Sequence, residues 1–158
     1  MDKTITLYHH ILVPLDGSDL AETALATAFQ LAEGTGSQVT LLRVVEPLPV
    51  TIQPASYHKL TEMAEREAVE YVEALREKLP KTAVTTEVKL LRGDAAETIL
   101  YYADLNDVDL IVMTSHGRSG ISRWYHGSVT ESVLRGATCA TLVLRQQPVT
   151  VPEPVLAA

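Results

Sequence analysis

One stretch of the chain, residues 114–128, combines glycines with hydroxyl and arginine side chains in a pattern suited to binding an anion. It holds three of the eight glycines and directly follows the apolar run 108–113. Its last residue, Ser128, opens a Ser-x-x-Glu capping box, which predicts the start of a helix. Backbone N–H groups of a glycine-rich loop and of a helix N-terminus then point toward one small volume, and together they favour a phosphate group.

Two common phosphate-binding motifs do not fit this chain. A P-loop needs a lysine after its last glycine, and neither Gly117 nor Gly120 is followed by lysine. A dinucleotide-binding fingerprint needs Gly-x-Gly-x-x-Gly after the first strand, whereas residues 16–19 read Asp-Gly-Ser-Asp. The permanent cations of the loop, Arg118 and Arg123, suit charge-assisted bonds to phosphate without either motif.

The composition predicts a single domain with its own core, since 46% of the 158 residues are hydrophobic. A formal net charge of -7 disfavours nucleic acid or an anionic membrane surface as a partner. No apolar run approaches the roughly 20 residues of a membrane-spanning helix, and the first residues do not open a signal peptide, so we expect a cytoplasmic protein. The one cysteine, Cys139, lies in an apolar run and is expected to pack in the core.

Alternating strand and helix patterns predict an α/β fold with an open, five-stranded parallel sheet covered by helices on both faces. The proline-rich segment 47–54 is expected to be a loop, and the partly alternating run 84–91 is expected near a sheet edge. The predicted strands are 10–15, 39–45, 84–91, 108–113 and 140–145, and the predicted helices are 19–33, 60–79, 95–103 and 128–136.

Several polar segments follow predicted strands and should therefore lie close together. In an open parallel sheet, ligands bind at the edge formed by the carboxyl ends of the strands. Residues 14–17, 44–46, 93–94 and 114–128 all reach that edge. The anion-binding loop is thus expected to form one part of a larger site.

The loop resembles that of the nucleotide-binding members of the universal stress protein family, which carry Gly-x-x-Gly-x9-Gly-Ser/Thr after the fourth strand. Nine residues separate Gly117 from Gly127, and Ser128 follows, although Thr114 stands in place of the first glycine. The similarity covers about residues 8–145. It includes Val-Pro-Leu-Asp-Gly-Ser at 13–18, Leu-Leu-Arg-Val at 41–44, Arg-Gly-Asp at 92–94 and Cys-Ala-Thr-Leu-Val-Leu at 139–144.

This resemblance implies a Rossmann-like sheet in the order 3-2-1-4-5, similar to that of the adenine nucleotide alpha hydrolases, and a homodimer formed through the fifth strand. We expect this domain to span residues 1–146, and the proline-containing segment 147–158 to form a tail. The implied ligand is ATP, held by residues of four segments, and the negative net charge of the chain leads us to expect Mg²⁺ with it. Adenosine would contact Pro14, Leu15, Asp16 and, mainly through its backbone, Val44; ribose and phosphates would lie against Thr114, Ser115, His116, Gly117, Arg118 and Gly120; and the phosphate chain would reach Gly127, Ser128, Val129 and Thr130.

Three functions remain open for the sequence. The first is an ATP-binding regulatory or stress-response protein, and the second is a slow ATPase in which Asp16 and His116 are the candidate groups. The third is a nucleotide-free interaction module, which the threonine at position 114 favours. Asp16 and Ser128 also have a simpler interpretation, because both residue types cap turns and helices without any ligand.

Overall fold

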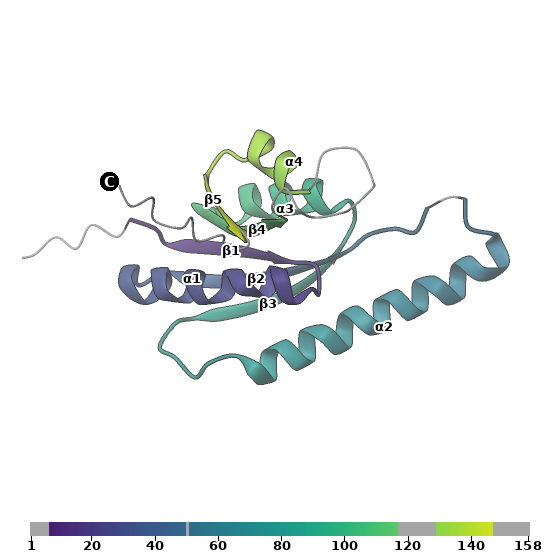
Figure 1. Ribbon diagram of the computed structural model, residues 1–158, viewed down its shortest axis with the longest axis horizontal. Coiled ribbons are helices and arrows are strands. Elements are labelled where there is room, and N and C mark those ends of the chain that lie inside the picture. Colours follow the sequence, from purple (N-terminus) through teal and green to yellow (C-terminus); the bar gives the residue numbers. More distant parts are fainter. Residues whose placement is uncertain (1–6, 50, 117–128, 147–158) are drawn as a thin grey trace, which may run out of the picture.

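The structure, a computed structural model, describes residues 7–49, 51–116 and 129–146. Its centre is a parallel five-stranded sheet in the order β3-β2-β1-β4-β5 (Figure 1), which confirms the expected fold class and strand order. The strands are β1 (His10–Leu15), β2 (Gln38–Val45), β3 (Thr86–Arg92), β4 (Leu110–His116) and β5 (Ala140–Gln146).

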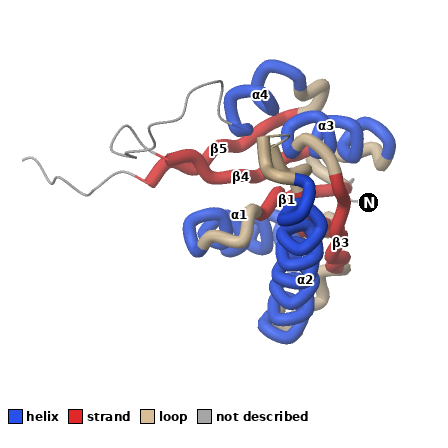
Figure 2. The backbone as a smooth tube through the Cα atoms, turned by 90° about the vertical axis from the view of Figure 1, so that its right-hand side faces the viewer, coloured by secondary structure: helices blue, strands red, loops and turns tan. Residues whose placement is uncertain are grey.

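The helices cover both faces of this sheet (Figures 1 and 2). The chain runs outward from β1 to β3 and then crosses to β4 and β5 on the other side of β1, and right-handed crossovers place the helices of these two halves on opposite faces. One face therefore carries α1 (Asp19–Thr35) and α2 (Pro54–Lys78), and the other carries α3 (Ala95–Leu105) and α4 (Val129–Gly136).

Two hydrophobic cores result from this arrangement. Ile11 and Val13 of β1 pack toward α1 and α2, whereas Leu12 between them packs toward α3 and α4, and all three are fully buried. Burying an aliphatic side chain of this size stabilises the fold by about 1.5–3 kcal/mol. A central strand with both faces buried has to be apolar at consecutive positions, as this one is.

Local signals in the sequence set where the helices begin and end. Ser18 caps α1 by accepting a hydrogen bond from the Ala21 amide at 3.1 Å, and Asp94 caps α3 by accepting one from the Glu97 amide at 2.9 Å. Gly36 ends α1 with a φ of 74°, a conformation that favours glycine. Serine and aspartate are common at the start of a helix, and glycine is common just after its end.

Several expected element boundaries differ from the structure by two or more residues, and two of these differences have a clear physical reason. Helix α2 begins at Pro54, which was assigned to the preceding loop, because proline at the first helical position needs no amide partner and already has a helical φ. Strand β4 continues to His116, so residues 114–116 belong to the sheet and not to the glycine-rich loop. They remain extended because β5 runs beside them, pairing Thr114 with Leu144.

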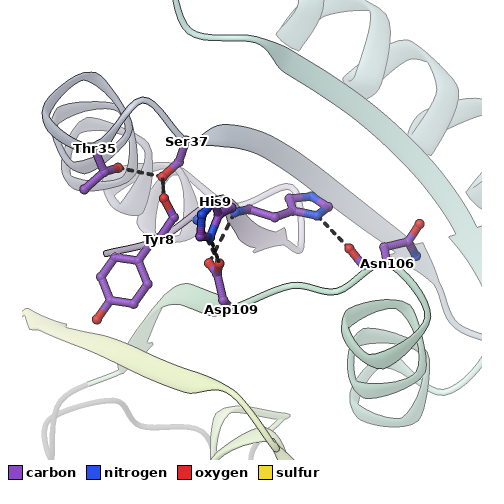
Figure 3. A network of polar contacts seen from close by, with 7 residues as sticks. Tyr8, His9, Thr35, Ser37, Asn106 and Asp109 are labelled. Carbon is purple, nitrogen blue, oxygen red and sulfur yellow. Dashed lines mark hydrogen bonds and ion pairs between the residues drawn. The ribbon is translucent and has the colours of Figure 1, made fainter. Parts of the chain in front are cut away.

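Polar contacts close the amino-terminal edge of the sheet, opposite the expected site (Figure 3). The Asp109 carboxylate accepts hydrogen bonds from the backbone amides of His9 and His10 at 2.7 and 3.2 Å. The buried His10 ring places Nδ1 2.9 Å from the Asn106 carbonyl and Nε2 2.8 Å from the Thr40 hydroxyl. Both nitrogens of His10 are thus engaged in holding β1 against β2 and the end of α3.

The single cysteine, Cys139, is half-buried and packs against the core beneath α3 and α4. Burial raises the pKa of its thiol, which lowers the fraction of reactive thiolate. Its packing agrees with the expectation of a structural rather than a reactive residue. Among the helices that the structure describes, none combines the length and the apolar character that crossing a membrane would require.

Candidate functional site

A cavity of about 290 Å³ lies at the carboxyl edge of the sheet, where β1, β2 and β4 end and α1, α3 and α4 begin. It brings together residues from segments that are far apart in the sequence, as the strand order requires. Seven of the residues named from the sequence line it: Pro14, Leu15, Asp16, Val44, Thr114, Val129 and Thr130.

The lining has an apolar part and a polar part. Leu42, Val44 and Ile99, from β2 and α3, form the apolar part together with Met113 of β4. The polar side chains are Asp16 and Ser18 from the turn after β1, Thr114 from β4 and Thr130 from α4, and Arg43 and Glu46 add charged groups on the side of β2. Such a cavity suits a ligand with a flat apolar ring at one end and hydroxyl or anionic groups at the other.

Asp16 is both a turn residue and part of the cavity wall. Its Oδ1 accepts hydrogen bonds from the Ser18 amide at 2.9 Å and the Ser18 hydroxyl at 2.6 Å. Partial burial works against the ionised form, but these hydrogen bonds, together with the charge of Arg43, keep the pKa of Asp16 below its usual value. The side chain is exposed at the cavity as a fixed carboxylate that can accept hydrogen bonds from a ligand.

Arg43 and Val44 line the cavity where strand β2 extends beyond the end of β1. The pairing of β1 with β2 ends at Leu15 and Arg43, whereas β2 continues alongside β3 to Val45. The Val44 carbonyl instead accepts a hydrogen bond from Nη1 of Arg43 at 2.9 Å. Arg43 was not among the residues expected from the sequence, although an arginine inside an apolar strand is a signal that could have identified it.

Two threonines connect the strand and helix ends around the cavity. The Thr114 hydroxyl donates to the carbonyl of Leu20 in the first turn of α1 at 3.1 Å. The Thr130 hydroxyl donates to the Thr114 carbonyl at 3.4 Å. The position at which the family carries its first glycine is therefore occupied by a threonine that bonds to α1 and to α4.

Glu46 lines the cavity on the side of α3; the sequence placed it at this edge of the sheet but did not single it out as a ligand contact. Its Oε1 accepts a hydrogen bond from the Ala95 amide at 3.3 Å, in the first turn of α3. The Gly93 amide donates to the Val45 carbonyl at 3.1 Å, which ties the end of β3 to the end of β2. A carboxylate directly after a buried strand was the available signal for this residue.

The remaining residues named from the sequence do not all fall within the described part of the chain. Ser115 is half-buried in β4 and is not among the described residues that line the cavity. His116 is the last residue of β4, where its backbone pairs with that of Gln146. Five others lie outside the described residues: Gly117, Arg118, Gly120, Gly127 and Ser128.

No metal centre accompanies this cavity in the ranges 7–49, 51–116 and 129–146. Within them, no group of three or more histidine, cysteine, aspartate or glutamate side chains could hold a metal ion.

Comparison with known proteins gives a consistent match over most of the chain. A model of the Universal stress protein family matches residues 7–145. A universal stress protein of Methanocaldococcus jannaschii is 31% identical over 142 residues, which are 89% of this chain and 84% of that protein. The solved structure of the universal stress protein UspA from Lactobacillus plantarum superimposes with a TM-score of 0.74 at 31% identity, covering 87% of this chain and 98% of that one.

More distant structures with the same fold contain adenine nucleotides. The universal stress protein from Archaeoglobus fulgidus in complex with dAMP is 22% identical, with a TM-score of 0.56 over 87% of this chain and 98% of that one. Other matching structures are complexes with cAMP or AMP. Because these structures are less than 25% identical to this chain, they show that the fold is shared and no more.

Proposed function

Because the chain belongs to the universal stress protein family, we propose that it is a cytoplasmic regulatory or stress-response protein that binds ATP and acts as a homodimer. The observation that carries this proposal is the cavity at the carboxyl edge, with its apolar wall from β2 and α3 and its polar groups from β1, β4 and α4. Structures of relatives in complex with AMP, dAMP and cAMP support an adenine nucleotide as the ligand.

The lining suggests how the nucleotide lies. The adenine ring packs on Leu42, Val44 and Ile99, and the ribose hydroxyls donate to the Asp16 carboxylate. The cavity, at about 290 Å³, is slightly smaller than the range of about 300–1,000 Å³ that is usual for ligand sites, so the phosphate chain extends beyond it. It leaves past Val129 and Thr130, where the N-terminus of α4 offers backbone amides to an anion.

The edge strand β5 supports the proposal of a dimer. It pairs on one side only, with β4, and its other backbone edge is open in the described chain. Its central side chains, Thr141 to Leu144, are half-buried and mostly apolar. Unprotected edge strands of this kind pair readily with a second copy, which would cover both the open hydrogen-bonding groups and the apolar surface.

Binding becomes a signal if it changes the equilibrium between conformations of the protein. A nucleotide that binds one conformation of the protein more tightly than others shifts the population toward that conformation. Helix α4, which lines the cavity, leads directly along the chain into strand β5. We propose that occupancy of the cavity is transmitted to the dimer surface along this path.

Mass spectrometry of nucleotides released from the denatured, freshly purified protein tests the proposal first, followed by calorimetric titration with ATP. We expect saturable binding that Gly127→Val abolishes. Gly34→Val is the matched control, because Gly34 is exposed in α1 with open space around it. Absence of saturable binding by the folded wild-type protein would rule out the nucleotide-binding proposal and favour the nucleotide-free interaction module.

Magnesium is expected to strengthen ATP binding, because the protein carries a formal net charge of -7 and a divalent cation offsets repulsion of the phosphates. The affinity measured with and without magnesium checks this point. Slow hydrolysis would appear as phosphate release proportional to protein concentration. Loss of that release in Asp16→Ala, with ATP binding retained, would assign a hydrolytic role to Asp16.

A further inference from the structure

Glu46 occupies a distinct place in the cavity. It follows the last residue of β2 and contributes to the lining together with Val44 of the same strand and Ala95 of α3. The other described cavity residues from β2 and α3 are apolar except for Arg43. Glu46 is therefore the carboxylate that the cavity carries beside the apolar residues of β2 and α3.

The backbone around Glu46 holds this carboxylate in place. The Ala95 amide donates to its Oε1 at 3.3 Å, and the Gly93 amide fixes the preceding residue, Val45, at 3.1 Å. Within the described chain, Oε2 has no hydrogen-bond partner. One oxygen thus anchors the side chain to α3, and the other is left to accept a hydrogen bond from a ligand.

The start of α3 is already occupied by negative charge. Glu46 accepts from the Ala95 amide, and Asp94 accepts from the Glu97 amide at 2.9 Å. Two carboxylates at this helix N-terminus repel a phosphate group by their charge and occupy its amides. An anionic ligand is consequently oriented with its phosphates toward α4 and its neutral ring toward Glu46.

We propose that Glu46 determines base specificity by accepting a hydrogen bond from the exocyclic amine of a bound adenine. This inference depends on the nucleotide-binding function proposed above. A carboxylate accepts but does not donate, so it selects a ring that carries an N–H group at its edge. The neighbouring Val44 carbonyl accepts from Arg43 at 2.9 Å and keeps a second lone pair, but the Glu46 carboxylate is charged and forms the stronger hydrogen bond with that amine.

The test compares ATP with purine riboside triphosphate, which lacks the amine but is otherwise the same molecule. The wild-type protein should bind ATP about 10- to 100-fold more tightly, the range of one hydrogen bond to a charged group. Glu46→Ala should reduce this preference to within about threefold of unity. Glu46→Gln retains an oxygen acceptor for the Ala95 amide, so the contact with α3 is kept. This variant should show an intermediate preference for ATP, which distinguishes recognition of the amine from loss of the contact with α3.

Glu62→Ala is the matched control, because Glu62 is an exposed carboxylate on α2 that does not line the cavity. It should keep the full preference for ATP while removing the same charge. An unchanged preference in a folded Glu46→Ala protein that still binds ATP would overturn the role of Glu46 alone. Tighter binding of GTP than ATP by the wild type would overturn the assignment to adenine, and failure to bind any of these nucleotides would overturn both proposals.

Discussion

The hydroxyl of Thr114 donates to the carbonyl of Leu20 at 3.1 Å and so ties the end of β4 to the first turn of α1. The family pattern carries glycine at this position, and a threonine there raised the question of whether a side chain would obstruct a nucleotide. The side chain instead has a partner within the protein. Its proton is used in that bond, so in this arrangement Thr114 offers a ligand an acceptor and not a donor.

Removing the Thr114 hydroxyl should destabilise the protein. In Thr114→Val the Leu20 carbonyl loses a donor while the shape of the side chain is retained, and we expect a loss of about 1 kcal/mol in the free energy of unfolding. Thr114→Ser keeps the hydroxyl and should lose less. Urea denaturation of the three proteins measures the difference, and equal stability of the valine and serine variants would contradict the importance of this bond.

Asp16 should titrate below the ordinary aspartate pKa of about 3.9. Burial raises its pKa, but the two hydrogen bonds from Ser18 and the nearby Arg43 lower it further. The carboxylate therefore adds to stability fully above about pH 4, and this contribution is lost as the pH falls through the lower, folded-state pKa. Carbon-13 NMR titration of the Asp16 carboxyl measures the midpoint directly.

The isosteric variant Asp16→Asn provides the control for that titration. Because its side chain does not ionise, the difference in unfolding free energy between wild type and variant should be constant at neutral pH and shrink in acid. A carboxyl midpoint above about 3.9 for the wild type would contradict the predicted direction of the shift.

Any side chain at Gly93 should destabilise the protein, and it should also weaken ATP binding. Its φ is 143°, and an added Cβ would lie 2.6 Å from Oγ1 of Thr98 in α3. Gly93→Ala combines backbone strain with this clash, for which we expect a loss of about 2–4 kcal/mol. It also displaces the segment that supports Val45 and Glu46, so ATP affinity should fall.

Gly36→Ala is the comparison for this variant. Gly36 has a φ of 74° but open space around it, and it lies between the end of α1 and the start of β2, at the edge of the sheet opposite the cavity. Its substitution should cost about 1 kcal/mol and leave ATP affinity unchanged. Equal losses of affinity in the two variants would indicate a general effect of destabilisation rather than a local one.

His10 should be important for stability and unimportant for nucleotide binding. Replacing it with leucine leaves the Asn106 carbonyl and the Thr40 hydroxyl without their partner in a buried site, which should cost about 1–3 kcal/mol. His9→Ala should cost less than about 0.5 kcal/mol, because the His9 side chain is 75% exposed. Thermal unfolding ranks the two variants, and a larger loss for His9 would contradict the proposed role of the His10 contacts.

The fold was largely predictable because its strands are buried on both faces. The continuous apolar runs at β1 and β2 place these strands within one residue, and the caps at Ser18 and Asp94 place the starts of two helices. The start of α2 was not predictable in the same way. Pro54 is equally suited to a loop and to a first helical turn, and the sequence alone does not decide between them.

The candidate site was predictable where strand ends and a helix start carry residues of the family pattern, such as Asp16, Val44 and Thr130, all of which line the cavity. Arg43 and Glu46 belong to no motif in the glycine-rich loop and were not named as ligand contacts. Their positions follow from how far β2 extends past β1 and from the hydrogen bond between Glu46 and α3. Such offsets between neighbouring strands depend on tertiary packing, which a single sequence does not report.

The cavity takes part of its lining from Ala21 of α1 and part from Ile99 of α3, which pack on opposite faces of the sheet. A bound molecule therefore touches both layers at once and acts as a cross-link between them. The ligand binds only while both helix layers are folded, so its binding free energy stabilises the two layers together and not one of them alone. Bound protein should consequently unfold in a more cooperative transition, with slower amide exchange in α1 and α3 together.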